Sequence, residues 1–145
     1  WNGPTEIEAE LPFRIIAEQL PVDFGEETPP EGGGIRLTYR YEGSLYVVPP
    51  GAHDDVRLAS ISRADGALLL EIVNQGTRHT LLTDLRILIS REEGGEPEIV
   101  LEGPTLAGIA GENMLARTVR RFAVTEPATL WDGPLYARLE YSPQY

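Results

Sequence analysis

The chain has 145 residues, 41% of them hydrophobic, so it is long enough and apolar enough to bury a core. Its 23 acidic and 12 basic residues give a formal net charge of −11, which argues against non-specific binding to nucleic acid because the phosphates would meet no positive field. The absence of cysteine excludes disulfides and thiolate–metal sites. No run approaches the roughly twenty apolar residues of a membrane span, so membrane insertion is not expected.

The first part of the chain predicts two strands joined by a polar loop. Residues 13–19 (FRIIAEQ) form a short β-rich run between two prolines. An acidic Pro/Gly loop follows at residues 22–34, and a long alternating strand then runs over residues 35–48. Because an isolated hairpin is marginal in water, we expect something else to cover these two strands.

The rest of the chain predicts short strands separated by turns, after a linker at residues 49–55 (PPGAHDD). The expected strands cover residues 56–62, 67–74, 86–90, 98–101, 114–124 and 135–141. A turn signal such as Ala64-Asp65-Gly66 separates each from the next. Residues 79–88 also fit a helical stripe, but their β-branched residues favour a strand. The predicted fold class is all-β, with spacing typical of an immunoglobulin-like sandwich of about 100 residues.

Four features in this order resemble a known family: "ELPFRIIAEQLP", a Pro/Gly loop, an alternating strand ending "SLYVVPPGA", and "LLLEIVNQGTRHTLLTDLRI". The family is that of the periplasmic pilus-assembly chaperones of the PapD-like group. The resemblance implies that residues 1–52 are the last two strands, F and G, of an incomplete N-terminal immunoglobulin-like domain. Residues 53–145 would form the C-terminal immunoglobulin-like domain. It also implies a periplasmic location, with the first five strands and a signal peptide outside this sequence.

The function implied by the resemblance is not enzymatic. Such a chaperone binds, stabilises and caps pilus or fimbrial subunits and delivers them to an outer-membrane usher. The subunit lacks one strand, and the strand at residues 35–48 would complete it by donor-strand complementation. The period of two places four side chains of this strand on one face, where we expect them to enter the subunit's groove. They are Ile35, Leu37, Tyr39 and Tyr41.

The family also holds the subunit's terminal carboxylate with two basic residues, one of them on a strand outside this sequence. The other stands five residues before the closing proline, where this sequence has Ser44. A hydroxyl donates a hydrogen bond but brings no charge, so it does not replace a charge-assisted contact. Arg40 lies on the same strand face as Ser44 and is a candidate substitute. This departure indicates a divergent branch, such as the archaic or spore-coat-type chaperones.

No other group of residues indicates catalysis, a metal or a cofactor. His53 and His79 are the only histidines, and neither the HxH nor the HExxH spacing occurs. We expect the stretch at residues 53–55 to be a solvated linker and His79 to be an ordinary strand residue. The acidic groups, including Glu6, Glu8 and Glu10, lie in polar contexts typical of a solvated surface. No serine has the G-x-S-x-G context of a nucleophile.

One basic cluster, Arg117, Arg120 and Arg121, lies in "LARTVRRF". Strand alternation predicts Arg117 and Arg121 on one face and Arg120 on the other. With so many acidic residues in the chain, ordinary ion pairs are expected, and a surface for the usher is the alternative.

Two further functions remain open from the residues alone. In the first, the chain is a non-enzymatic binding or adhesive module in which residues 1–55 form a swapped or interdomain hairpin. Such a chain would self-associate without any subunit. In the second, it is an enzyme of carbohydrate chemistry, which would require two carboxylates facing each other across a cleft.

Overall fold

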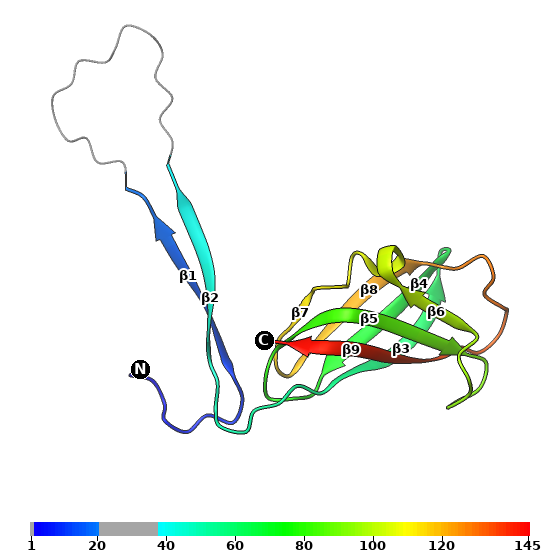
Figure 1. The fold of residues 1–145 in the computed structure, drawn as a ribbon, viewed down its shortest axis with the longest axis horizontal. Helices are drawn as coiled ribbons and strands as arrows, with labels where there is room; N and C mark the ends of the chain where they lie inside the picture. Colours follow the sequence, from blue (N-terminus) through cyan, green and yellow to red (C-terminus); the bar gives the residue numbers. More distant parts are fainter. Residues whose placement is uncertain (1, 21–37) are drawn as a thin grey trace, which may run out of the picture. The chain divides into compact units, whose positions relative to one another are not determined.

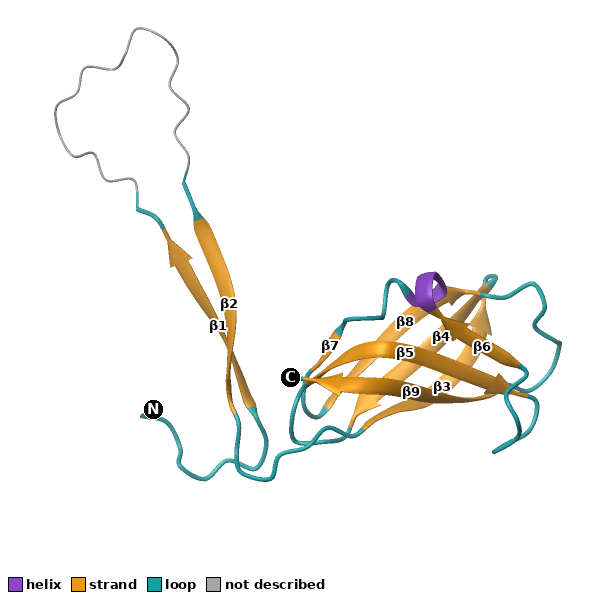
Figure 2. Ribbon diagram, in the orientation of Figure 1, coloured by secondary structure: helices purple, strands orange, loops and turns teal. Residues whose placement is uncertain are grey.

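The structure, a computed structural model, describes residues 2–20 and 38–145 (Figures 1 and 2). These residues are all-β, with no α-helix and one short 3-10 turn, η1, at Gly103–Leu106. The strands in chain order are β1 Leu11–Glu18, β2 Arg40–Val47, β3 Val56–Ala64, β4 Ala67–Asn74, β5 Thr80–Ser90, β6 Ile99–Glu102, β7 Asn113–Met114, β8 Thr118–Thr125 and β9 Tyr136–Gln144. They belong to two compact units.

The larger unit joins the described residues up to Glu10 with Val48–Tyr145 and is built from two antiparallel sheets. One sheet has the order β3-β4-β8. In the other, β5 is central, since the same stretch of β5 pairs with β6 on one edge and with β9 on the other, while β7 pairs with its start. Figure 2 shows these strands drawn in two layers.

A single hydrophobic core lies between the two sheets. The burial pattern of β4 alternates, so that Leu68, Leu70 and Ile72 point inward from the first sheet. Ile87 and Ile89 of β5 meet them from the second sheet and are likewise fully buried. Burying each such side chain contributes about 1.5–3 kcal/mol, which makes this core the main source of stability for the larger unit.

Several predicted elements are confirmed. β4 has the bounds expected for it, and residues 79–88 lie almost wholly in strand β5 rather than in a helix. The turn between β3 and β4 consists of Asp65 and Gly66, both with positive φ (51° and 75°), as a two-residue hairpin loop requires. Asp tolerates the left-handed region better than most residues, and glycine has no side chain to oppose it.

The single strand predicted over residues 114–124 is wrong. Arg117 has a φ of 56°, a left-handed conformation that does not continue a pleated strand. The chain instead leaves the second sheet after β7 and joins the first sheet as β8, beside β4. Because Arg117 precedes β8, the prediction that it shares a strand face with Arg121 is also wrong.

Candidate functional site

The candidate site is the hairpin of β1 and β2, which lies within the smaller unit, Leu11–Val47. The strands pair antiparallel along their whole length without a register shift. The backbone N–H of Gln19 donates to the carbonyl of Tyr39 at 2.9 Å, which extends the ladder by one pair. Residues directly opposite each other in an antiparallel pair point to the same side, so this register sorts the side chains onto two faces.

One face, here called the apolar face, carries no charged residue in the part of the hairpin that the structure describes. It consists of Leu11, Phe13, Ile15, Ala17, Tyr39, Tyr41, Gly43, Leu45 and Val47, with the uncharged Gln19 opposite Tyr39 at its end. The exposed fraction is 67% for Tyr41, 54% for Ile15 and 47% for Leu45. The rings of Tyr39 and Tyr41 stack with their centroids 6.3 Å apart. A contiguous row of exposed apolar side chains marks a surface suited to being covered.

The opposite face, here called the charged face, holds the ionised residues. It consists of Pro12, Arg14, Ile16, Glu18, Arg40, Glu42, Ser44 and Tyr46. Arg14 donates to Glu42 at 2.7 Å, and Arg40 lies 3.3 Å from Glu18 and 3.2 Å from Glu42. These pairs are exposed, so each adds at most about 1 kcal/mol to stability. Their main consequence is that the hairpin is amphipathic, with its charges on one side.

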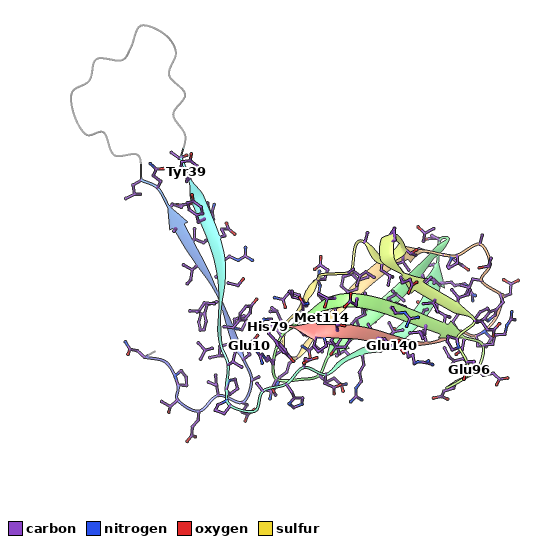
Figure 3. The ribbon with its side chains drawn as sticks, in the orientation of Figure 1. Glu10, Tyr39, His79, Glu96, Met114 and Glu140 are labelled. Atoms are coloured by element: carbon purple, nitrogen blue, oxygen red, sulfur yellow. The ribbon has the colours of Figure 1, made fainter. Side chains whose placement is uncertain are left out.

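The structure describes four of the six predicted site residues. Ile35 and Leu37 lie outside the described residues, as does the part of the predicted strand before residue 38. Tyr39 and Tyr41 lie together on the apolar face, at the end of the hairpin that Figure 3 marks with the label of Tyr39. Arg40 and Ser44 lie together on the charged face. The described strand β2 is therefore shorter than the predicted strand over residues 35–48.

Sequence reasoning missed Arg14 as a candidate site residue. Arg14 stands directly opposite Ser44 in the ladder, so it brings a positive charge to the same face. Arg40, the predicted substitute, already contacts two carboxylates of the hairpin. The missing signal was the register between the strands, which alternation within a single strand does not supply.

In the larger unit, Glu10 and His79 form a buried pair (Figure 3). The Glu10 side chain is fully buried, and its Oε2 lies 2.5 Å from Nδ1 of His79. The backbone N–H of Glu10 also donates to the carbonyl of Thr77 at 2.9 Å. The predictions that Glu10 is part of a solvated surface and that His79 is an ordinary strand residue are wrong. A buried carboxylate requires such a partner because desolvation penalises an unpaired charge.

Asn74, at the end of β4, is the centre of a second cluster of hydrogen-bonded polar groups in the larger unit. Its Oδ1 accepts from the backbone N–H groups of Asp55 and Gly76, at 3.1 and 3.0 Å. Its Nδ2 donates to the carbonyls of Arg78 and Met114, at 2.8 and 3.0 Å. One fully buried side chain thus satisfies four backbone groups from three separate segments.

Residues 53–55 are bonded to the loop at residues 75–79, so the prediction of a solvated linker is confirmed for the exposed His53 but is wrong for Asp54 and Asp55, which are partly buried. The carbonyl of His53 accepts from the backbone N–H groups of Thr77 and Arg78, at 2.8 and 3.0 Å. The Asp54 carboxylate accepts hydrogen bonds from the hydroxyls of Tyr141 and Tyr145. Partial burial by itself raises the pKa of Asp54, but these hydrogen bonds outweigh it and hold that pKa below its usual value. The pKa of Tyr141 is raised, chiefly because its hydroxyl is partly buried and secondly because it donates a hydrogen bond to Asp54.

The lowered pKa of Asp54 predicts a pH-dependent contribution to stability. A carboxyl whose pKa is lower in the folded state contributes stability above its unfolded pKa of about 3.9. That contribution is lost as the pH falls through the folded pKa. Urea unfolding at pH 7 and at stepwise lower pH should show that the free energy of unfolding of the wild type declines. The decline should be smaller for Asp54→Asn, which has no carboxyl at this position. Equal pH dependence in the two proteins would contradict this role.

The outer face of the β3-β4-β8 sheet has a hollow of about 420 Å³. Ser60 and Ser62 of β3 line it, together with Glu71 and Arg121. Nε of Arg121 donates to Glu71 at 2.8 Å, so the two charges neutralise each other. The other residues that line the hollow are Leu69, Leu70, Phe122 and Ala123.

The basic cluster forms ion pairs, as expected. Arg120 pairs with Glu112, and Arg121 pairs with Glu71. Arg117 approaches the carboxylate of Glu8 at 3.5 Å.

Within residues 2–20 and 38–145, no group of three or more potential ligands is placed to hold a metal ion, and no helix has the length and hydropathy to span a membrane. Comparison of the chain with protein-family models, with curated proteins and with solved structures finds no match.

Proposed function

We propose that the chain is a periplasmic pilus-assembly chaperone of the PapD-like type. It binds and caps subunits that lack a strand, using residues 35–48 as the donor strand, and passes them to an outer-membrane usher. The observation that carries this proposal is the amphipathic hairpin, whose apolar face is exposed while its charges lie on the other side. In this proposal the larger unit is the C-terminal immunoglobulin-like domain, and the hairpin is the F–G pair of the domain before it.

The physical basis is strand addition to an open edge. A sandwich that lacks a strand exposes backbone groups and a strip of its apolar core. A donated strand supplies the missing hydrogen bonds, and every second side chain fills the strip. Chaperone–pilin complexes are a known example of this mode. Tyr39 and Tyr41 have the alternation and the exposure that such insertion needs.

β2 is the better donor of the two strands. It has a single neighbour, β1, in the described part of its sheet, so it is an edge strand. β1 contains Pro12, which lacks a backbone N–H, and a proline within a strand interrupts the ladder on its open side. The described β2, Arg40–Val47, contains no proline. A new strand therefore gains an uninterrupted ladder only beside β2.

The charged face is the place for the subunit's terminal carboxylate. Ser44 stands where the resemblance implies a basic residue, and Arg14 lies directly opposite it. Arg40 is on the same face. A carboxylate there would exchange places with Glu42, which now contacts both arginines.

Tyr41→Asp tests the proposal. The aspartate would place an ionised group in an apolar contact, so we expect subunit affinity to fall more than about a hundredfold. The matched control is Tyr136→Asp, which makes the same change at a partly exposed tyrosine of β9. Each variant is co-expressed with a pilus subunit and purified, and the co-purified subunit is quantified. Equal recovery with both variants would contradict strand donation by β2.

Light scattering of the chain alone distinguishes the alternative, a module that self-associates through its hairpin. The chaperone proposal expects Tyr41→Asp to abolish binding to the subunit. A dimer that Tyr41→Asp dissociates, together with no binding to any co-expressed subunit, would favour the self-associating module instead.

A further inference from the structure

Gly43 lies at the centre of the apolar face, at a position where neither the backbone conformation nor the available space requires glycine. It is within β2, directly opposite Ile15, and its φ is outside the left-handed region. A Cβ built at this position would meet no atom within 4 Å. Glycine weakens a strand, because it adds backbone entropy and has no side chain to pack. Neither the backbone nor the packing of the described residues explains why a strand former is absent here.

The neighbours of Gly43 on the apolar face are large and exposed. Alternation places Tyr41 before it and Leu45 after it, and Ile15 faces it across the ladder. The exposed fractions of these three side chains range from 47% to 67%. Gly43 is therefore a vacant position within a row of large side chains. A glycine in a strand interior often marks a bulge, a tight bend or a site of close approach, and the ladder of β1 and β2 has no register shift that would indicate a bulge.

The charges of the hairpin define what fits this vacancy. The apolar face carries no charge in its described part, and the charges of the opposite face pair with one another. A charged side chain brought to Gly43 would lose its hydration without finding a partner. A large uncharged side chain would instead contact three apolar neighbours and exclude water from them.

We propose that Gly43 receives a bulky apolar side chain of the bound subunit, and that this contact selects among subunits. The inference rests on the proposed function. It assigns to Gly43 a specificity-determining role and to the subunit an aromatic or branched aliphatic residue that packs between Tyr41 and Leu45. Subunits with a small residue at that point would leave the vacancy unfilled and bind more weakly.

A size series at Gly43 tests this inference. Gly43→Ala, Gly43→Val and Gly43→Phe are titrated with the purified subunit used for Tyr41→Asp. We expect affinity to fall with size, by at least tenfold for Gly43→Val. Gly108→Ala is the control, since Gly108 also has no atom within 4 Å of a built Cβ and no left-handed φ. Circular dichroism and melting temperature verify folding, which we expect to be unchanged because the site is open.

The outcomes separate this inference from the proposed function. Graded loss across the series, with Gly108→Ala binding as wild type, supports the contact. Restoration of binding to Gly43→Val by a subunit variant shortened at one apolar residue would support it further. If Gly43→Val binds as tightly as wild type or tighter, while Tyr41→Asp binds nothing, the role of Gly43 is overturned and strand donation stands. If wild type binds no subunit, both fail.

Discussion

Gly76→Ala is expected to destabilise the larger unit by about 3 kcal/mol, with a melting temperature lower by more than about 10 °C. A Cβ on Gly76 would lie 2.3 Å from the carbonyl oxygen of His53 and 2.6 Å from the backbone nitrogen of Asp55. Both contacts are with backbone atoms, so a side-chain rotation does not relieve them. The loop and residues 53–55 would have to separate, which breaks the hydrogen bonds that Thr77 and neighbouring residues donate to this segment.

Differential scanning calorimetry of Gly76→Ala measures this effect. Gly108→Ala is the matched control, because its added methyl group meets no atom within 4 Å. We expect the control to melt within about 2 °C of wild type. A Gly76→Ala protein as stable as the control would mean that the close approach of residues 53–55 to this loop is not required for folding.

Local signals in the sequence predicted most of the strands. β4 was predicted with its observed bounds because it is a short, mainly apolar run with turn residues on both sides. The turn at Asp65 and Gly66 was predicted because each residue has its own reason to adopt positive φ. Both features depend on neighbours in the sequence. Arg117 gave no such signal, since arginine has no preference for the left-handed region that breaks the strand there.

The polar contacts of the larger unit escaped prediction because they join distant residues. Glu10 and His79 are 69 positions apart, and Tyr141 and Asp54 are 87 positions apart. A glutamate among alternating acidic residues has the pattern of a solvated surface, and only the fold shows that one of them is buried. The same limit applies to the hairpin. Alternation predicted that Tyr39 and Tyr41 share a face, whereas the register that sets Arg14 beside Ser44 comes from pairing.

Several of these distant contacts are made by the short "VNQG" stretch at residues 73–76 and by the residues just after it. It contains Asn74, whose side chain accepts a hydrogen bond from the segment at residues 53–55, and it ends with Gly76, which allows that segment to approach. His79, just beyond, pairs with Glu10. Residues on both sides of the hairpin in the sequence are therefore fixed by one loop of the larger unit.

Asn74→Ala is expected to destabilise the larger unit by about 3–5 kcal/mol, because four backbone groups, two in buried and two in partly buried hydrogen bonds, lose their partner at once. Two are N–H groups, of Asp55 and Gly76, and two are carbonyls, of Arg78 and Met114. Asn74→Asp keeps the acceptor and loses the donor, so it should be destabilised as well, since its carboxylate would face two carbonyls.

Gln75→Ala is the control, an adjacent amide that is exposed. Urea unfolding should show a lower midpoint for both Asn74 variants and an unchanged one for the control. Stability of Asn74→Ala within 1 kcal/mol of wild type would show that water replaces the amide, so that the segment at residues 53–55 is held chiefly by its backbone bonds to the loop.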